Sequence, residues 1–297
     1  MLFLPGHWIK RNQTKFNDMQ LKKSFLLIAG TLLFLGNAML QPASAQQASV
    51  KLFAHRGGAH EFDENTLEAF RSSYEKGIRG FETDIRISKD GELVIFHDAS
   101  LKRMVEAEGG IETLTSKELR KFKTKKGNPI LFLDEFLDYF KDKPGVYIEF
   151  EMKTNSPMYD EAALKTYCDK LYQKEMAARP QGSDYVFTSF DKRPLKYLKK
   201  TYPGVDLLFI KSEGLSDSLI AELEELGITR IGCRLDGTTR AMVEKAQKKG
   251  ITVSCWPGRT VEDFVLGVGL GCDYLCSDIP VQVRSWAENN LPWVIIK

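Results

Sequence analysis

Short apolar runs alternate along most of the chain with longer segments in which apolar residues recur every three or four positions. The short runs predict buried strands, and the longer segments predict helices with one buried face. Strands are predicted at Lys51–Ala54, Gly80–Ile87, Leu93–Phe96, Val146–Met152, Tyr185–Thr188, Val205–Ile210, Thr229–Gly232, Thr252–Cys255 and Tyr274–Cys276. Helices are predicted at Thr66–Lys76, Glu161–Lys174, Arg193–Lys200, Ser216–Leu226, Thr239–Lys248 and Val261–Val268.

This alternation of strands and helices predicts an α/β fold with a parallel sheet. The nine predicted strands are one more than a closed (β/α)8 barrel needs. The turn signal Asp90-Gly91 accounts for the extra strand, because Leu93–Phe96 would fold back antiparallel on the strand before it. The polar stretch Ala99–Asp134 then becomes an insertion. We therefore predict a TIM-type (β/α)8 barrel with a small insertion above its C-terminal mouth, and Asn65 as the N-cap of the first helix.

The N-terminal segment has a different pattern. Lys22 and Lys23 precede an apolar run, and the small residues Pro42–Ala45 follow it. This order is typical of a secretory signal peptide, with cleavage after Ala45. An uncleaved membrane anchor is the alternative, but the apolar run is short for a span of roughly 20 residues.

We accordingly predict a signal peptide over residues 1–45 and a single barrel domain over residues 46–297. The protein would be exported, to a periplasm or outside the cell, without a stable membrane anchor after cleavage. Residues 1–45 carry a net charge of +4, whereas the whole chain carries +2. The remainder is therefore near −2, which predicts no nucleic-acid partner.

The five cysteines all follow the predicted signal peptide. An odd number without regular spacing does not indicate a disulfide framework. Cys233, Cys255 and Cys276 fall in or beside apolar runs and are expected to be buried as small hydrophobic side chains. Cys272 and Cys276 look too isolated from other ligands to bind zinc.

Polar side chains stand at the ends of several predicted strands. His55 directly follows the first strand, and His97 directly follows Leu93–Phe96. Glu82 and Asp84 share one face of their strand, because side chains repeat with a period of two. The C-terminal ends of barrel strands meet at one mouth, where active sites lie. We therefore expect these side chains to converge there.

A third carboxylate, Glu151, ends the strand Val146–Met152. Together with Glu82 and Asp84 it makes an all-oxygen ligand set, which suits one hard divalent cation, Ca²⁺ or Mg²⁺.

Arg56 and Lys153 add positive charge at the same mouth, as an anionic substrate such as a phosphate requires. The two histidines, His55 and His97, are suited to proton transfer near neutral pH. His60 has no comparable neighbours and is expected to be exposed or to lie behind the site. A metal site, two cations and two histidines together favour phosphodiester hydrolysis.

At these positions the chain resembles the glycerophosphodiester phosphodiesterase family. The matching segments follow the family's order and cover nearly all of the chain after the predicted signal peptide. They are His55-Arg56-Gly57, Glu64-Asn65-Thr66, Gly80-Phe81-Glu82-Thr83-Asp84, Val94-Ile95-Phe96-His97-Asp98, Glu151-Met152-Lys153, Thr188-Ser189-Phe190, Trp256 and Ser277-Asp278-Ile279-Pro280.

The resemblance implies a TIM-barrel enzyme that hydrolyses small glycerophosphodiesters to glycerol 3-phosphate and an alcohol. It implies a metal held by three carboxylates, an acid–base pair of two histidines, and four substrate-binding residues. These are Glu82, Asp84 and Glu151 for the metal, His55 and His97 for catalysis, and Arg56, Lys153, Phe190 and Trp256 for substrate. The oligomeric state is left open.

Three positions depart from the family pattern. One is Met104, which follows Arg103 where the family often has Thr. Glu149 stands where the family more often has a neutral residue, so it is either a further ligand or an exposed neighbour. After Trp256 the family usually continues Thr-Val-Asn, whereas this chain has Pro257-Gly258-Arg259.

Similar His, Glu-x-Asp and His patterns occur in sphingomyelinases D, so a lysophospholipase D or sphingomyelinase D-like activity is the nearest alternative. A non-enzymatic alternative is an exported protein that binds phosphodiesters. Such a protein would need Arg56 and Lys153 but neither histidine.

Overall fold

The computed structural model describes residues 47–297, so the predicted signal peptide lies outside the described residues. Eight strands of this part form a parallel barrel, in which β1 pairs with both β10 and β2 and so closes the ring. The strands are β1 (Ala48–Ala54), β2 (Gly80–Ile87), β5 (Tyr147–Met152), β6 (Asp184–Ser189), β7 (Leu207–Gly214), β8 (Arg230–Arg234), β9 (Thr252–Gly258) and β10 (Tyr274–Ser277). The predicted TIM-type barrel is confirmed.

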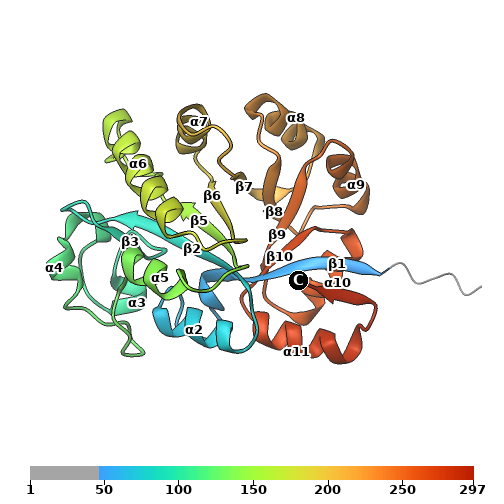
Figure 1. Cartoon of the computed structure of the whole chain (residues 1–297), viewed down its shortest axis with the longest axis horizontal. Helices are drawn as coiled ribbons and strands as arrows, with labels where there is room; N and C mark the ends of the chain where they lie inside the picture. Colours follow the sequence, from blue (N-terminus) through green and yellow to red (C-terminus); the bar gives the residue numbers. More distant parts are fainter. Residues whose placement is uncertain (1–46) are drawn as a thin grey trace, which may run out of the picture. The chain divides into compact units, whose positions relative to one another are not determined.

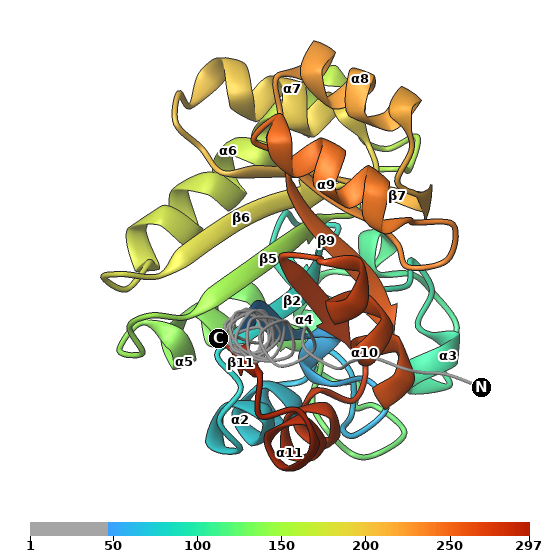
Figure 2. The ribbon, with the colours of Figure 1, turned by 90° about the vertical axis from the view of Figure 1, so that its right-hand side faces the viewer.

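Helices surround these strands (Figure 1). They are α2 (Leu67–Glu75), α5 (Leu133–Phe140), α6 (Glu161–Ala178), α7 (Lys192–Thr201), α8 (Asp217–Leu226), α9 (Arg240–Lys248), α10 (Val261–Leu270) and α11 (Pro280–Asn290). All six predicted helices are present, whereas α5 and α11 were not predicted. The view in Figure 2, turned by 90° about the vertical axis from Figure 1, shows helices α6 to α9 lying outside the strands. None of the helices within residues 47–297 is long and apolar enough to cross a membrane.

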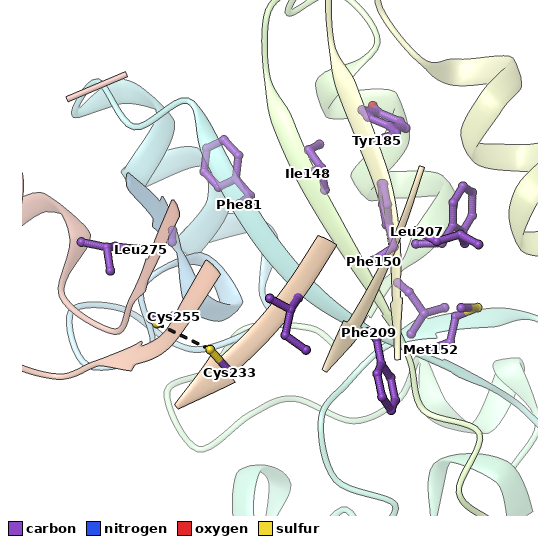
Figure 3. Close-up of a cluster of buried hydrophobic side chains, with 14 of the residues drawn as sticks. Phe81, Ile148, Phe150, Met152, Tyr185, Leu207, Phe209, Cys233, Cys255 and Leu275 are labelled. Atoms are coloured by element: carbon purple, nitrogen blue, oxygen red, sulfur yellow. Dashed lines mark hydrogen bonds between the residues drawn. The ribbon is translucent and has the colours of Figure 1, made fainter. Parts of the chain in front are cut away.

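The strands divide their side chains between two cores. Along β5, Ile148, Phe150 and Met152 point outward and pack against the helices (Figure 3). Tyr147, at the start of the same strand, belongs instead to the core inside the barrel. Glu149 and Glu151 follow it at a spacing of two, so they also face inward. The period-two pattern of β5 therefore directs its carboxylates into the barrel.

The extra predicted strand, Leu93–Phe96, folds back antiparallel as predicted. β3 (Leu93–Ile95) runs antiparallel to the last residues of β2, with Ile95 opposite Ile85. The insertion after it contains α3 (Lys102–Val105), α4 (Ser116–Leu119) and a short strand, β4 (Leu131–Phe132), which pairs with β3. The hairpin end and the insertion share a small apolar core, which consists of Val94, Phe96, Leu101, Ile111, Leu119, Ile130 and Phe132.

Two further features differ from the prediction. The short strand β11 (Val294–Ile296) pairs with the first residues of β1. A run of three apolar residues is too short to predict this pairing. The N-cap of α2 is Thr66, whose hydroxyl accepts the N–H of Ala69. The prediction of Asn65 as the cap was wrong, because Asn65 has a left-handed φ of 57° and its amide binds elsewhere.

Candidate active site

A cavity of about 110 Å³ opens at the C-terminal mouth of the barrel. Its lining includes eight of the nine site residues proposed from sequence, contributed by several strands and loops. They are His55, Arg56, Glu82, His97, Glu151, Lys153, Phe190 and Trp256. The ninth, Asp84, is fully buried beside them.

Three carboxylates form one compact group. Oxygens of Glu82, Asp84 and Glu151 lie within 4.8 Å of one another. The group arises from strand register, since Asp84 on β2 is directly opposite Glu151 on β5. Oε1 of Glu82 is buried and has no hydrogen-bond partner among the described residues, and Oδ1 of Asp84 has only an ion pair with Lys153. A buried acceptor without a donor in an all-oxygen cluster fits a hard divalent cation.

The pKa values of two of these carboxyls diverge. Burial, and then the charges of Asp84 and Glu151, raise the pKa of Glu82 well above its ordinary value. Burial also acts to raise the pKa of Asp84, but the charges of Lys153 and Arg56 outweigh it and hold that pKa far below its usual range. The cluster therefore has one carboxyl that resists ionisation and one that is firmly ionised.

Two cations lie directly on the carboxylate group. Nζ of Lys153 is 2.8 Å from Oε1 of Glu151 and 3.2 Å from Oδ1 of Asp84. Nε of Arg56 is 3.4 Å from Oδ2 of Asp84. Burial lowers the pKa of each cation, but the neighbouring carboxylates outweigh it and raise both pKa values above their ordinary values. Both side chains therefore stay protonated.

Arg56 is held by its own backbone as well. It adopts a left-handed φ of 51°, in the turn that follows β1, and its N–H donates to Oε2 of Glu82 at 3.1 Å. A non-glycine residue in this region is strained, and such strain recurs at functional sites. The turn thereby aims both the backbone and the side chain of Arg56 at the carboxylates of β2.

Each of the two histidines is bound by an aspartate. Nδ1 of His55 lies 2.5 Å from Oδ1 of Asp278, and Nδ1 of His97 lies 2.7 Å from Oδ1 of Asp98. In both pairs this leaves Nε2 available, and Nε2 of His55 is 3.9 Å from Oε2 of Glu82. A carboxylate on one ring nitrogen sets the tautomer and the orientation of the other.

Sequence reasoning did not give these two aspartates a role. Burial acts to raise the pKa of Asp278, but its hydrogen bond to His55 and the charges nearby outweigh it and lower the pKa. Burial also opposes ionisation of Asp98, and hydrogen bonds from Arg103 and His97 lower its pKa. Asp98 has a local signal, because it directly follows His97. Asp278 is 223 positions from His55 and has none.

Further side chains support the same groups. Nδ2 of Asn65 donates to Oδ2 of Asp84 at 2.7 Å, which explains why Asn65 is not a helix cap. Arg86 donates twice to the carbonyl oxygen of His97, at 3.0 and 2.7 Å, and so anchors the end of the hairpin. His60 and Arg259 are largely exposed, and each has a nitrogen 3.6 Å from Oδ2 of Asp278.

Glu149 is neither exposed nor part of the carboxylate group. It is buried, it lines the cavity, and its Oε1 accepts the hydroxyl of Tyr147 at 2.5 Å. Burial raises the pKa of Glu149 to about 7. The structure thus excludes the exposed position that was one of the two alternatives for this residue.

The opposite wall of the cavity is apolar. The rings of Phe190 and Trp256 meet edge to face with centroids 5.6 Å apart, and Leu208 and Ile210 lie beside them. One side of the mouth is therefore charged and the other is apolar, which suits a substrate with a phosphate and an organic substituent.

The barrel and its mouth define a TIM-barrel phosphodiesterase. The sequence profile of the glycerophosphoryl diester phosphodiesterase family matches residues 55–282. Mouse glycerophosphodiester phosphodiesterase 1 is 31% identical over 242 residues, which are 72% of this chain and 73% of that protein. The glycerophosphodiester phosphodiesterase of Caldanaerobacter subterraneus is 25% identical over 77% of this chain and 94% of its own. The chain therefore belongs to the glycerophosphoryl diester phosphodiesterase family.

Solved structures share the fold. A phosphodiesterase of Oleispira antarctica in complex with its product sn-glycerol-3-phosphate aligns with a TM-score of 0.73 at 22% identity, over 80% of this chain and 96% of its own. The glycerophosphodiester phosphodiesterase of Thermotoga maritima aligns with a TM-score of 0.61 at 23% identity, over 81% and 98%.

Proposed function

We propose that this enzyme cleaves glycerophosphodiesters to glycerol 3-phosphate and an alcohol, with a bound divalent cation and with His55 and His97 as acid and base. One observation carries the proposal: three buried carboxylates, two cations and two aspartate-bound histidines surround a single cavity. The glycerol 3-phosphate held by the related Oleispira protein supports the choice of substrate.

Glu82, Asp84 and Glu151 would hold the cation, Ca²⁺ or Mg²⁺, which when bound supplies Lewis-acid polarisation of a phosphate oxygen. The charge balance supports this assignment. Among residues 47–297, Arg56 and Lys153 are the permanent cations paired with the three carboxyl groups, and Glu149 adds a fourth acidic group to the same cavity. Four acidic groups thus share two permanent cations in a buried site, and the raised pKa values of Glu82 and Glu149 reflect the cost of ionising them there. A divalent cation would offset that cost.

Arg56 and Lys153 bind the phosphate. Both are permanently charged, and both are already positioned by the carboxylates of β2 and β5. Donors held in place before the reaction stabilise the charge that develops on phosphate oxygens without further rearrangement.

The histidines move protons. With Nδ1–H donated to an aspartate, Nε2 of one histidine takes a proton from the nucleophile, and the other histidine, protonated, gives one to the leaving alkoxide. The nucleophile is either water or the 2-hydroxyl of the substrate's glycerol, which would form a cyclic phosphate. Asp278 and Asp98 keep both rings in the required orientation and stabilise the imidazolium.

Incubation of the purified protein with glycerophosphodiesters, with and without a chelator, tests the proposal. Glycerol 3-phosphate should appear and should be lost with EDTA or with the double variant His55→Ala/His97→Ala. Binding of the diesters without any product would instead favour the phosphodiester-binding alternative. Faster turnover of lysophosphatidylcholine or sphingomyelin in the same assay would favour the lysophospholipase D or sphingomyelinase D alternative.

We also propose that the enzyme acts outside the cytoplasm, after cleavage of residues 1–45. The motivating observation is the signal-peptide pattern that ends at Ala45. The mature protein should begin at Gln46, and N-terminal sequencing of protein recovered from the native cells checks this. Recovery of protein that begins at Met19 or earlier, and so still carries the residues up to Ala45, would contradict it.

A further inference from the structure

Three free thiols lie in contact on the outer side of the barrel, away from the cavity. Cys233 on β8 and Cys255 on β9 are direct neighbours in the sheet, and their Sγ atoms are 3.8 Å apart (Figure 3). Cys272 lies in the loop between α10 and β10, with its Sγ 3.4 Å from that of Cys255. Cys255 therefore contacts both other thiols. The sequence did not indicate that Cys272 lies beside other thiols, because these contacts form only in the folded sheet.

The cluster is not a zinc site of the usual kind. Structural zinc sites take four cysteine, histidine or carboxylate ligands. Within residues 47–297, the group Glu82, Asp84 and Glu151 alone brings three such ligands within 4.8 Å of one another. The three thiols are not all within that distance of one another, and Cys255 contacts each of the other two, so the cluster is suited to pairwise chemistry.

We infer that Cys255 and Cys272 are an oxidisable pair, which a peroxide converts into a disulfide between β9 and the loop that precedes β10. The pair Cys233 and Cys255 is less favourable. Its Sγ atoms are farther apart, at 3.8 Å against 3.4 Å, and both residues are fixed in adjacent strands about 4.7–4.9 Å apart, whereas a disulfide needs Cβ atoms about 3.5–4.5 Å apart. Cys272 is on a loop, so it can approach Cys255 without breaking the strand pairing.

The entry point for the oxidant is Cys272. It retains 3% exposure, whereas Cys233 and Cys255 have 0%. Its thiolate attacks one oxygen of hydrogen peroxide, the O–O bond breaks, and sulfenic acid and hydroxide form. The thiol of Cys255 then attacks the Cys272 sulfur, its S–H bond and the S–O bond break, and water leaves. The proton released from Cys272 converts the first hydroxide to water, so two thiols and one peroxide give one disulfide and two waters.

The thiol pair is connected to the active site through strand β9. Ser254 and Trp256, on either side of Cys255, both line the cavity. A cross-link on the outer face of β9 would therefore fix the strand that forms part of the apolar wall. The test below measures thiols and unfolding, so it does not depend on the proposed catalytic roles.

The experiment is thiol mapping of the full-length reduced protein. The protein is exposed to hydrogen peroxide, quenched, denatured and alkylated, and its peptides are identified by mass spectrometry. We expect two of the five thiols to escape alkylation and the peptides of Cys255 and Cys272 to be joined. Dithiothreitol should restore five alkylated thiols, and the oxidised protein should unfold at a higher temperature than the reduced one.

Three variants sharpen the result. Cys168→Ser removes a buried thiol elsewhere, on α6, and should leave the cross-link unchanged. Cys233→Ser should also retain it, because the third thiol is not needed. Cys272→Ser should abolish it. Five alkylated thiols after oxidation, a cross-link to any other cysteine, a Cys233–Cys255 disulfide in the Cys272→Ser variant, or irreversible oxidation of Cys272 without a cross-link would each overturn the inference.

Discussion

At the scale of single residues, the two histidines are alike in one contact and differ in their surroundings. The Nδ1 atom of each histidine is hydrogen-bonded to an aspartate. His55 directly precedes Arg56, the proposed phosphate ligand, and lies within 3.9 Å of Glu82, whereas His97 stands at the end of the β2–β3 hairpin. We therefore propose His55 as the base and His97 as the acid, with the hairpin holding His97 on the leaving-group side of the mouth.

This assignment predicts different losses with different leaving groups. An alkoxide needs a proton to leave, whereas a nitrophenolate barely does. His97→Ala should lower kcat by about 10²–10⁴-fold on a glycerophosphodiester and much less on a nitrophenyl diester. His55→Ala should be severe on both, and the exposed His60→Ala serves as a control. Equal losses for the two variants on both substrates would contradict the division of roles.

A second residue-scale prediction concerns Glu175 on α6, which is fully buried. Neither of its carboxylate oxygens has a hydrogen-bond partner among the described residues, and burial raises its pKa well above the ordinary value. The folded protein therefore keeps this proton at a pH where the unfolded chain has lost it. Stability from this group is complete below about pH 4, and it declines as pH rises toward the folded pKa, by about 1.4 kcal/mol per pH unit.

Glu175→Gln should remove this decline. Urea unfolding of both proteins between pH 5 and pH 8 measures it, and the variant should gain stability over the wild type as pH rises. Glu161→Gln, at the exposed start of α6, is the matched control and should follow the wild type. Identical slopes for wild type and Glu175→Gln would show that Glu175 is not a buried, unpaired acid.

At the scale of elements, strand β2 pairs with two different neighbours along its length. Its residues from Gly80 to Ile85 pair with β5 inside the barrel, and its last residues, Ile85 to Ile87, pair with β3. The first part carries Glu82 and Asp84, and the hairpin brings His97 back to the same mouth. One strand and its turn thus position two carboxylates and one histidine.

The start of β2 is where the barrel closes, and Gly80 leaves room for it. A Cβ at this position would lie 2.5 Å from Cβ of Phe53 and 3.0 Å from the carbonyl oxygen of Leu52, both on β1. Gly80→Ala should lower the free energy of unfolding by about 1–3 kcal/mol, as overpacking does. Gly269→Ala in α10 is the control, because nothing lies within 4 Å of its added Cβ. It should stabilise the helix by up to about 1 kcal/mol. Equal stability of the two variants by urea unfolding would contradict this.

At the scale of the whole molecule, the carboxylate group exists because the barrel sets β2 beside β5, which are separated in sequence by the hairpin, the insertion and α5. A cation bound there would stabilise the closed barrel, since a ligand that binds only the folded state shifts unfolding toward higher temperature. The same property gives a readout of the metal site that is separate from activity.

Chelation should therefore have two effects. EDTA should abolish activity, with recovery in Ca²⁺ or Mg²⁺, and added cation should raise the unfolding temperature of the chelated protein. Glu82→Gln, Asp84→Asn and Glu151→Gln should each lose this thermal shift. Glu149→Gln should keep it, because Glu149 is outside the three-carboxylate group. Full activity after exhaustive chelation would refute the metal site.

The sequence by itself determined what depends on local pattern. Alternation along strands and helices identified the eight barrel strands, and the turn at Asp90-Gly91 identified the antiparallel hairpin. Because side chains alternate along a strand, and strand ends meet at one mouth, His55, Glu82 and Glu151 were expected together, and they line one cavity.

The tertiary structure alone decided which distant groups touch. The aspartate on His55, the amide of Asn65 on Asp84, the burial of Glu149 and the contact of Cys255 with Cys272 all follow from how the strands and loops pack. Periodicity says which face a side chain occupies, but not which side chain lies opposite it. That choice is made by register and by closure of the barrel, which join residues far apart in the chain.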